Sequence, residues 1–320
     1  MQQQKLLSLI SNLLPEENSL AEQIASVLDI SYGAAYRRIN NKSKISIDEA
    51  ITLAKHFNLS IDSLFGTGDE NVIPIRKMQI LKGTADFEKY FTNSTELLTP
   101  LLNIKNSEII YSAKDLPIFY TSEGNMLTRF KLFVWLQILD PSFKLTQFSN
   151  FALPSSLKKS YQKFGLLYDN LNTVEIWDIT TINSTLKQLH YYFESGIITS
   201  EETSILCDDL KKLIHRIYAK SVPNSNFKLY YNELLLMSNN VLIKTPLQNS
   251  LFVPFTVLNY FNTNDTKTCE QVSDFIAEQL KQSKLINTSG EKEKNIFFNK
   301  IFSKIDELKS HVNGKLILDF

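Results

Sequence analysis

The sequence predicts a mainly helical protein of two domains: a small five-helix N-terminal domain, and a larger, mainly helical α+β domain with a small antiparallel sheet. Apolar residues recur at helical spacing along the first 65 residues. Two glycines, two acids and a proline at residues 66–75 then interrupt that pattern. Beyond residue 226, aromatic and β-branched runs separated by short turn signals indicate two or three antiparallel strands.

The composition is that of an ordinary globular protein, with 43% hydrophobic and 21% charged residues among 320. The formal net charge is zero, so any attraction to nucleic acid must come from a local cluster of cations. The N-terminus leads directly into an amphipathic helix, and no apolar run has the length of a membrane span. Cys207 and Cys269 are expected to be reduced thiols. We therefore expect a cytoplasmic protein with no membrane contact.

Residues 19–40 read as two helices joined by a tight turn. Ser19 and Glu22 have the spacing of a capping box at the start of the first helix. Ser31 is placed to cap the second helix through its hydroxyl. The exposed face of that second helix carries polar and aromatic residues: Tyr32, Tyr36, Arg37 and Asn40. A helix of this kind, braced by another, suits the DNA major groove.

Three further helices are predicted around this pair. Residues 5–14 form the first helix, residues 46–57 the fourth and residues 60–65 a short fifth. Ser46 and Glu49 predict a second capping box at the start of the fourth helix.

The N-terminal domain resembles the Cro/CI (Xre) type of helix-turn-helix domain. AAYRRINNK stands where many relatives carry a T-V-S-R-x-x-N-G-K-like run, and the AYRR run is similar to the N-terminal domain of BetR-type transcription regulators. The family's usual turn glycine is Asp29 here, and its usual β-branched core residue is Ala35. Gly33 lies inside the second helix, where it costs roughly 1 kcal/mol relative to alanine. The alternative is a helical hairpin with no role in DNA binding.

Charge is uneven along this domain, because four cations and no acid lie between Asp29 and Asp48. With the resemblance, this pattern predicts a surface for double-stranded DNA. The predicted base contacts are Tyr32, Tyr36, Arg37 and Asn40, and the predicted phosphate contacts are Ser31, Arg38, Lys42 and Lys44. The alternative is that these cations are merely solvated.

We expect the helix-turn-helix domain to cover residues 1–67, a linker residues 68–77 and a sensing and dimerisation domain residues 78–320. Helices of the last domain are predicted at 84–104, 125–139, 155–170, 181–194, 200–220, 268–285 and 290–310. Residues 173–179 are a strand or a helix entry, and the tail GKLILDF is a candidate final strand. Two more capping boxes are predicted, Thr199 with Glu202 and Thr288 with Glu291.

The second domain resembles the long C-terminal bodies of uncharacterised regulators of the Bacteroidetes type. The runs that carry this resemblance are AKDLPIF, FKLFVW, LNYFNTND and SGEKEKNIFFN. It implies a regulator but specifies neither a ligand nor an operator.

No catalytic constellation is visible, since the sequence lacks G-x-G-x-x-G, P-loop, G-x-S-x-G and H-E-x-x-H motifs. The four histidines are isolated in sequence, so neither a metal site nor a cofactor is expected. Lys114 and Asp115 interrupt an apolar run and are candidates for a charged pair lining a pocket. The alternative for this pair is a solvated turn.

The sequence therefore predicts a transcriptional regulator that binds specific DNA sequences, is no enzyme, forms a homodimer and senses a small-molecule or protein effector. The alternative is a protein-interaction or phage-defence factor that uses the helix-turn-helix as a scaffold.

Overall fold

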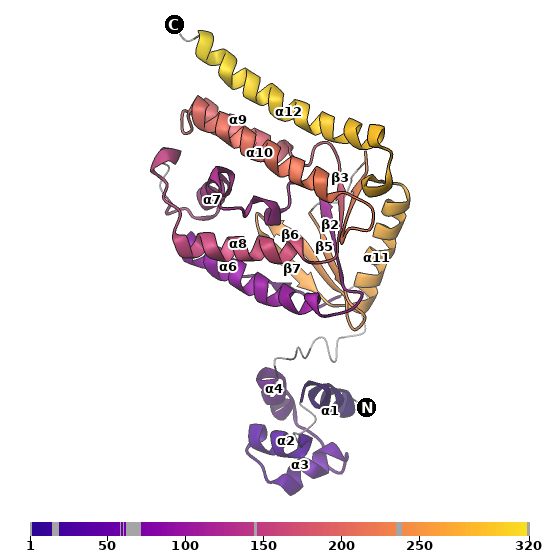
Figure 1. Ribbon diagram of the computed structural model, residues 1–320. Helices are drawn as coiled ribbons and strands as arrows, with labels where there is room; N and C mark the ends of the chain where they lie inside the picture. The colour runs from indigo at the N-terminus through magenta and orange to yellow at the C-terminus, as the bar shows by residue number, and fades with distance from the viewer. Residues whose placement is uncertain are drawn as a thin grey trace. The chain divides into compact units, whose positions relative to one another are not determined.

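The computed structural model describes residues 2–14, 19–57, 59, 61, 72–143, 146–234 and 239–318, with only the backbone for 315–318. The chain divides into two compact units, Met1–Ile75 and Arg76–Phe320. We call them the first and second unit and describe each by itself. The mainly helical class predicted from the sequence is confirmed (Figure 1).

The first unit is a small helical bundle. Its described helices are α1 (Gln2–Leu13), α2 (Leu20–Leu28), α3 (Tyr32–Ile39) and α4 (Ile47–His56). Each contributes apolar residues to one core, which includes Leu6, Ile10, Ile24, Ala35 and Leu53. The predicted fifth helix at 60–65 lies outside the described residues, apart from Ile61.

Helix starts in both units test the predicted capping boxes. Those of Ser46 with Glu49 and of Thr199 with Glu202 are confirmed, because each side chain bonds the other residue's amide. The predicted box of Ser19 is wrong: its side chain makes no capping bond, and its carbonyl instead accepts from the Gln23 amide at 3.1 Å.

The second unit is built on an eight-stranded sheet among the described residues, with the order β1-β7-β6-β5-β2-β3-β4-β8. The strands are β1 (Arg76–Lys77), β2 (Glu108–Ala113), β3 (Thr173–Trp177), β4 (Phe227–Tyr231), β5 (Val241–Lys244), β6 (Ser250–Thr256), β7 (Asn259–Thr263) and β8 (Lys284–Leu285). Residues 173–179, for which the sequence allows a strand or a helix entry, thus begin with the strand β3.

The sheet is mixed, where the sequence predicted a small antiparallel one. β5, β6 and β7 form the expected antiparallel meander. β2, β3 and β4 are parallel neighbours, with Ile110 opposite Val174 and Val174 opposite Lys228. Their parallel pairing follows from the long helical connections between them, because parallel strands need a crossover.

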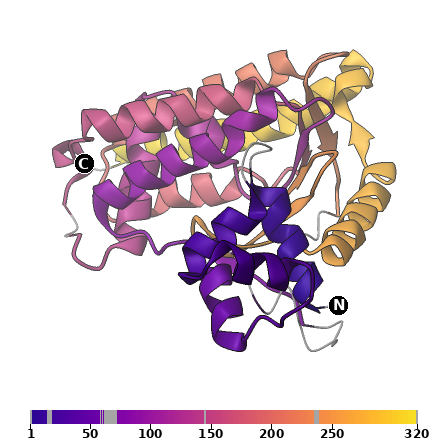
Figure 2. The ribbon, with the colours of Figure 1, turned by 90° about the horizontal axis from the view of Figure 1, so that it is seen from below.

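Helices cover the two faces of this sheet unequally. They are α6 (Gly83–Leu98), α7 (Met126–Leu139), α8 (Ser155–Asp169), α9 (Asn183–Glu194), α10 (Ser200–Lys220), α11 (Thr266–Lys281) and α12 (Glu291–Leu318), with short 3₁₀ turns η1 (Thr99–Leu102), η2 (Ile118–Thr121), η3 (Phe148–Asn150) and η4 (Ile286–Thr288). α11 lies across the strands from the others (Figures 1 and 2). It packs on the smaller core, through Cys269 and Ile276. The larger core fills the opposite side.

The C-terminal segment differs from its prediction. α12 begins at Glu291, after Gly290, whose carbonyl accepts from the Glu293 and Lys294 amides. Thr288 lies in η4 and is not the helix cap, so its predicted capping box is wrong. The tail predicted as a strand continues α12 to Leu318. Within the described residues, no helix combines the length and apolarity needed to cross a membrane.

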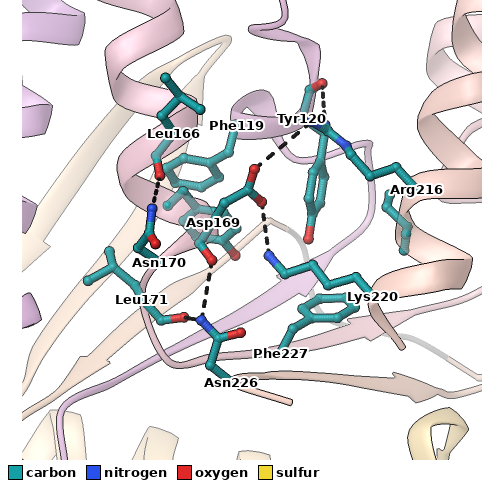
Figure 3. A network of polar contacts seen from close by, with 12 residues as sticks. Phe119, Tyr120, Leu166, Asp169, Asn170, Leu171, Arg216, Lys220, Asn226 and Phe227 are labelled. Carbon is teal, nitrogen blue, oxygen red and sulfur yellow. Dashed lines mark hydrogen bonds and ion pairs between the residues drawn. The ribbon is translucent and has the colours of Figure 1, made fainter. Parts of the chain in front are cut away.

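Polar contacts tie the ends of the crossover helices together (Figure 3). Asp169, which ends α8, accepts a hydrogen bond from Lys220 Nζ at 2.9 Å and lies 3.9 Å from Arg216. Arg216 also donates to the Tyr120 carbonyl at 3.3 Å, and Asn226 donates to the Asp169 carbonyl at 3.2 Å. These bonds join η2, α8 and α10 where the chain enters β3 and β4.

A carboxyl group lies deeper in the same region. Glu175, in the middle of β3, is fully buried. Its Oε1 accepts from the hydroxyls of Tyr120 at 2.6 Å and Tyr168 at 2.7 Å, and its Oε2 accepts from Trp177 Nε1 at 2.7 Å. Burial raises the pKa of Glu175, and the three donors oppose that rise.

Candidate nucleic-acid interface

The turn between α2 and α3 explains one departure from the family pattern. Asp29 adopts the left-handed conformation, with φ 51° and ψ 48°. Glycine adopts this conformation without strain, and Asp is among the few other residues that tolerate it. The Ile30 amide then bonds the Ala25 carbonyl at 3.0 Å, which closes α2. Asp29 therefore fills the role of the turn glycine.

α3 presents an aromatic surface to solvent. Ser31 caps it as predicted, with Oγ 3.3 Å from the Ala34 amide. Tyr32 is 53% exposed and Tyr36 51% exposed, and their rings stack with centroids 6.4 Å apart. A Cβ added to Gly33 would meet no atom within 4 Å, so this face is open.

The polar residues that follow on α3 and its loop are also exposed. Arg37, Asn40, Lys42 and Lys44 lie on the surface of the unit. Asn40 donates to the Tyr36 carbonyl at 2.9 Å, so a base contact requires its amide to turn away. The Lys42 amide bonds the Arg37 carbonyl at 2.8 Å, which turns the chain back at the end of α3.

Gln3, near the N-terminus on α1, holds this loop through direct hydrogen bonds. Its Nε2 donates to the carbonyls of Arg38 at 2.6 Å and Ser43 at 3.0 Å. Its Oε1 accepts from the Ile45 amide at 2.9 Å. The position of the Lys42 and Lys44 loop therefore depends on α1, which no motif in the sequence indicates.

Arg38 faces into the unit. Its Nη2 lies 2.6 Å from Glu49 Oε1, and its Nε lies 3.1 Å from Glu49 Oε2. The two side chains are only 18% and 21% exposed. A phosphate contact by Arg38 must therefore compete with this carboxylate. The same hydrogen bonding lowers the pKa of Glu49.

Arg38→Ala is expected to destabilise the first unit by roughly 1–2 kcal/mol, because it removes a two-pronged charged hydrogen bond. The lowered pKa of Glu49 makes this stabilisation complete above pH 4.5, its ordinary value, and lost as the pH falls below that. Hydrogen exchange of the α2–α4 amides at pH 7 and pH 3.5 measures both effects. Lys55→Ala, which removes an exposed charge from α4, is the control. Equal protection in the two variants contradicts the assignment.

Lys114 and Asp115 follow β2, but they do not pair with each other. Lys114 Nζ lies 3.5 Å from Asp178 Oδ2, at the end of β3. The Asp115 carboxylate accepts from the Leu116 amide at 2.8 Å, and its own amide bonds Asn239 Oδ1. Lys114 lines a cavity of about 760 Å³, whereas Asp115 is not among the residues lining it.

Two histidines expected to be isolated lie together. His190 and Glu194, one turn apart on α9, meet His311 of α12. His190 Nε2 and His311 Nε2 lie 3.6 Å and 3.7 Å from Glu194 Oε1. The i, i+4 spacing of His190 and Glu194 predicts that they are neighbours on a helix. No sequence signal predicts that His311 of α12 lies beside them.

One comparison with known proteins finds a match. Residues 4–109, about a third of the chain, match the family model of the BetR domain. The match covers the first unit and extends through α6 and η1 of the second. No curated protein and no solved structure matches the chain. Residues 4–109 are thus a BetR domain, a helix-turn-helix-like regulatory domain, which indicates a DNA-binding regulatory role in general.

Proposed function

We propose that the protein is a transcriptional regulator that binds specific sites on double-stranded DNA through the Cro/CI-like helix-turn-helix of its first unit. The exposed face of α3 supports this proposal most directly. Tyr32, Tyr36 and Arg37 project from a helix braced by α2, as in helix-turn-helix proteins that place this helix in the major groove. Asn40 is proposed as a further base contact and Ser31 as a phosphate contact.

The second unit is proposed as the part that dimerises and senses. One helix-turn-helix covers a few base pairs, and a symmetric pair doubles the site. Light scattering of the full chain at micromolar concentration should give about 74 kDa, twice the 36.8 kDa of one chain. One protein chain per particle, both in the free protein and in the complex with DNA, would argue against pairing.

The proposal is tested by selecting genomic fragments that the purified protein retains, followed by gel shifts at several salt concentrations. Recovery of one sequence with a two-fold pattern supports a regulator that reads DNA directly. If no fragment is enriched and no salt-dependent shift occurs, the alternative of a protein-interaction or phage-defence factor is favoured.

Lys42→Ala and Lys44→Ala are each expected to weaken binding to all DNA sequences alike. Each loss should reduce the slope of log K against log salt by roughly 0.9, the contribution of one phosphate contact. Titrations between about 50 and 200 mM salt measure this slope. Lys55→Ala, an equal loss of charge on α4, should leave the slope unchanged. Loss at one operator base with an unchanged slope would assign these lysines to base contacts instead.

A further inference from the structure

One cavity of the second unit lies where the parallel strands end. Lys114 follows β2 and Thr180 follows β3, and both line it. Ligands of open α/β sheets bind outside the carboxyl ends of parallel strands. The volume of about 760 Å³ is within the usual range for small-molecule sites, roughly 300–1,000 Å³.

The lining of this cavity is basic. Lys114 and Lys187 contribute to it, and no acid is among its described lining residues. Asp178 lies behind Lys114, and its other oxygen accepts from the Thr180 amide and hydroxyl, at 2.5 and 2.6 Å. The charge of Lys114 is thus partly balanced by Asp178. Lys187, on α9, is an exposed residue of the cavity lining.

A third lysine lies directly behind the lining. Lys131 is 2% exposed, and among the described residues its Nζ donates to two neutral oxygens, Thr185 Oγ1 at 3.2 Å and Gln188 Oε1 at 2.9 Å. Gln188 itself lines the cavity. Lys131 lies three residues before Val134, a lining residue of the same helix α7. Burial lowers the pKa of Lys131, so an anion nearby would stabilise its charged form.

Neutral donors complete this surface. Gln137 Nε2 is buried beside the cavity and has no hydrogen-bond partner among the described residues. Asn183 and Ser184 form the first turn of α9, whose helix dipole favours negative charge at that end. On the other walls, Ile138, Tyr191 and Tyr192 offer apolar surface.

We propose that this cavity binds a small phosphomonoester, with the phosphate between Lys114, Lys187 and Ser184 and its organic part against Tyr191 and Ile138. Lysine binds phosphate as a point charge, and a helix start adds donors. The aromatic and aliphatic walls need a ligand that is more than an inorganic anion. The role of this cavity as an effector site rests on the proposed function. Its binding of a phosphomonoester does not depend on whether the protein binds DNA.

Calorimetry on the full chain with phenyl phosphate tests the proposal. Saturable binding is expected, stronger than that of inorganic phosphate, with no binding of the uncharged benzyl alcohol. Lys187→Gln should weaken it about ten-fold, the usual loss for one charged hydrogen bond. Lys212→Gln, at a lysine 75% exposed on α10, removes the same charge outside the cavity and should have no effect.

Three results would overturn this assignment: no binding of phenyl phosphate at millimolar concentration, equal binding of benzyl alcohol, or equal losses in the two lysine variants. The titrations contain no DNA, so they remain readable if the DNA-binding proposal fails. If both proposals hold, phenyl phosphate changes DNA affinity, and DNA changes phenyl phosphate affinity by the same factor.

A separate observation, the cluster of His190, Glu194 and His311, carries a second inference. The three ligand atoms lie within 4.8 Å of one another, on two helices. A tetrahedral zinc ion with bonds of about 2.0–2.1 Å places its ligands roughly 3.4 Å apart. The observed 3.6 and 3.7 Å separations from Glu194 Oε1 are close to that value, and the two imidazole nitrogens, within 4.8 Å of each other, have to move closer together.

We infer that this cluster binds a divalent zinc ion and clips α12 to α9. Val312, next to His311, is fully buried, so this part of α12 is already packed against the body. His190 and His311 line a surface groove together with Lys304, whose Nζ donates to the Ile179 carbonyl at 2.7 Å and to Asn183 Oδ1 at 3.0 Å. These two oxygens fix the position of the Lys304 ammonium group.

Zinc titration of the chelator-treated full chain should show one saturable site per chain. His190→Ala and His311→Ala should each weaken it at least about ten-fold, since each removes one of three ligands. His215→Ala, at an exposed histidine of α10 outside the cluster, should bind normally. Absence of saturable binding, or an equal loss in His215→Ala, would refute the site.

Discussion

Glu175→Ala is expected to destabilise the second unit by about 3–5 kcal/mol, because it leaves three buried hydrogen-bond donors without an acceptor and creates a cavity. The hydroxyls of Tyr120 and Tyr168 and the indole N–H of Trp177 all point at this one carboxyl group. Both tryptophans, Trp135 and Trp177, belong to the second unit. Urea unfolding followed by tryptophan fluorescence therefore reports this unit alone.

Conservative variants separate the parts of this effect. In Glu175→Gln the amide oxygen still accepts from both tyrosines, but the amide nitrogen meets the Trp177 N–H, so an intermediate loss is expected. Tyr168→Phe should cost about 1 kcal/mol, a typical single hydrogen bond. Equal stability of wild type and Glu175→Ala would refute the network's role.

The same residue predicts how stability depends on pH. Because the pKa of Glu175 is raised above its ordinary 4.5, the folded state keeps a proton that the unfolded state has lost. Stability is therefore complete below pH 4.5 and declines as the pH rises through the folded-state pKa. Glu175→Gln has no such titration and should show a flatter profile across this range.

Arg37→Ala should cost about 1–3 kcal/mol at one base position of the operator, since its planar fork can bond two acceptors of a guanine. Arg37 lies on the exposed face of α3, and the nearby carboxylate of Glu49 pairs with Arg38 instead. Binding to operators substituted at each position measures the effect. A uniform loss at every position would make Arg37 a phosphate contact.

Arg37→Lys is the sharper form of this test. Lysine retains the charge but lacks the fork. The variant should therefore keep the salt dependence of wild type and lose discrimination at the same base. If Arg37→Lys discriminates as wild type does, the role in base reading is wrong.

Local signals predicted local structure well. Capping residues and apolar stripes placed most helices, because both act within a few residues of the chain. The parallel centre of the sheet was missed because β4 and β5, adjacent in sequence, do not pair. β4 lies beside β3, and β5 beside β2. Which strands pair depends on how the crossover helices pack on the sheet, and the residue pattern of a single strand carries no information about that packing.

The candidate sites divide in the same way. The exposed face of α3 follows from helical spacing alone, as do Tyr32 and Tyr36. Arg38 looked like a member of the basic surface, but Glu49 on the next helix turns it inward. Lys131 was hidden within the apolar run FKLFVW, where a buried cation has no distinguishing signal.

The short strand β1 determines where the second unit can be separated from the first. Arg76 and Lys77 pair with Asn262 and Phe261 of β7, and the Met78 amide bonds the Tyr260 carbonyl. A fragment starting at the predicted boundary of residue 78 would lack β1, and one edge of β7 would lose its hydrogen-bonding neighbour. Bare sheet edges recruit other chains. Expression of the body alone therefore has to start before Arg76, or its yield will be limited by aggregation.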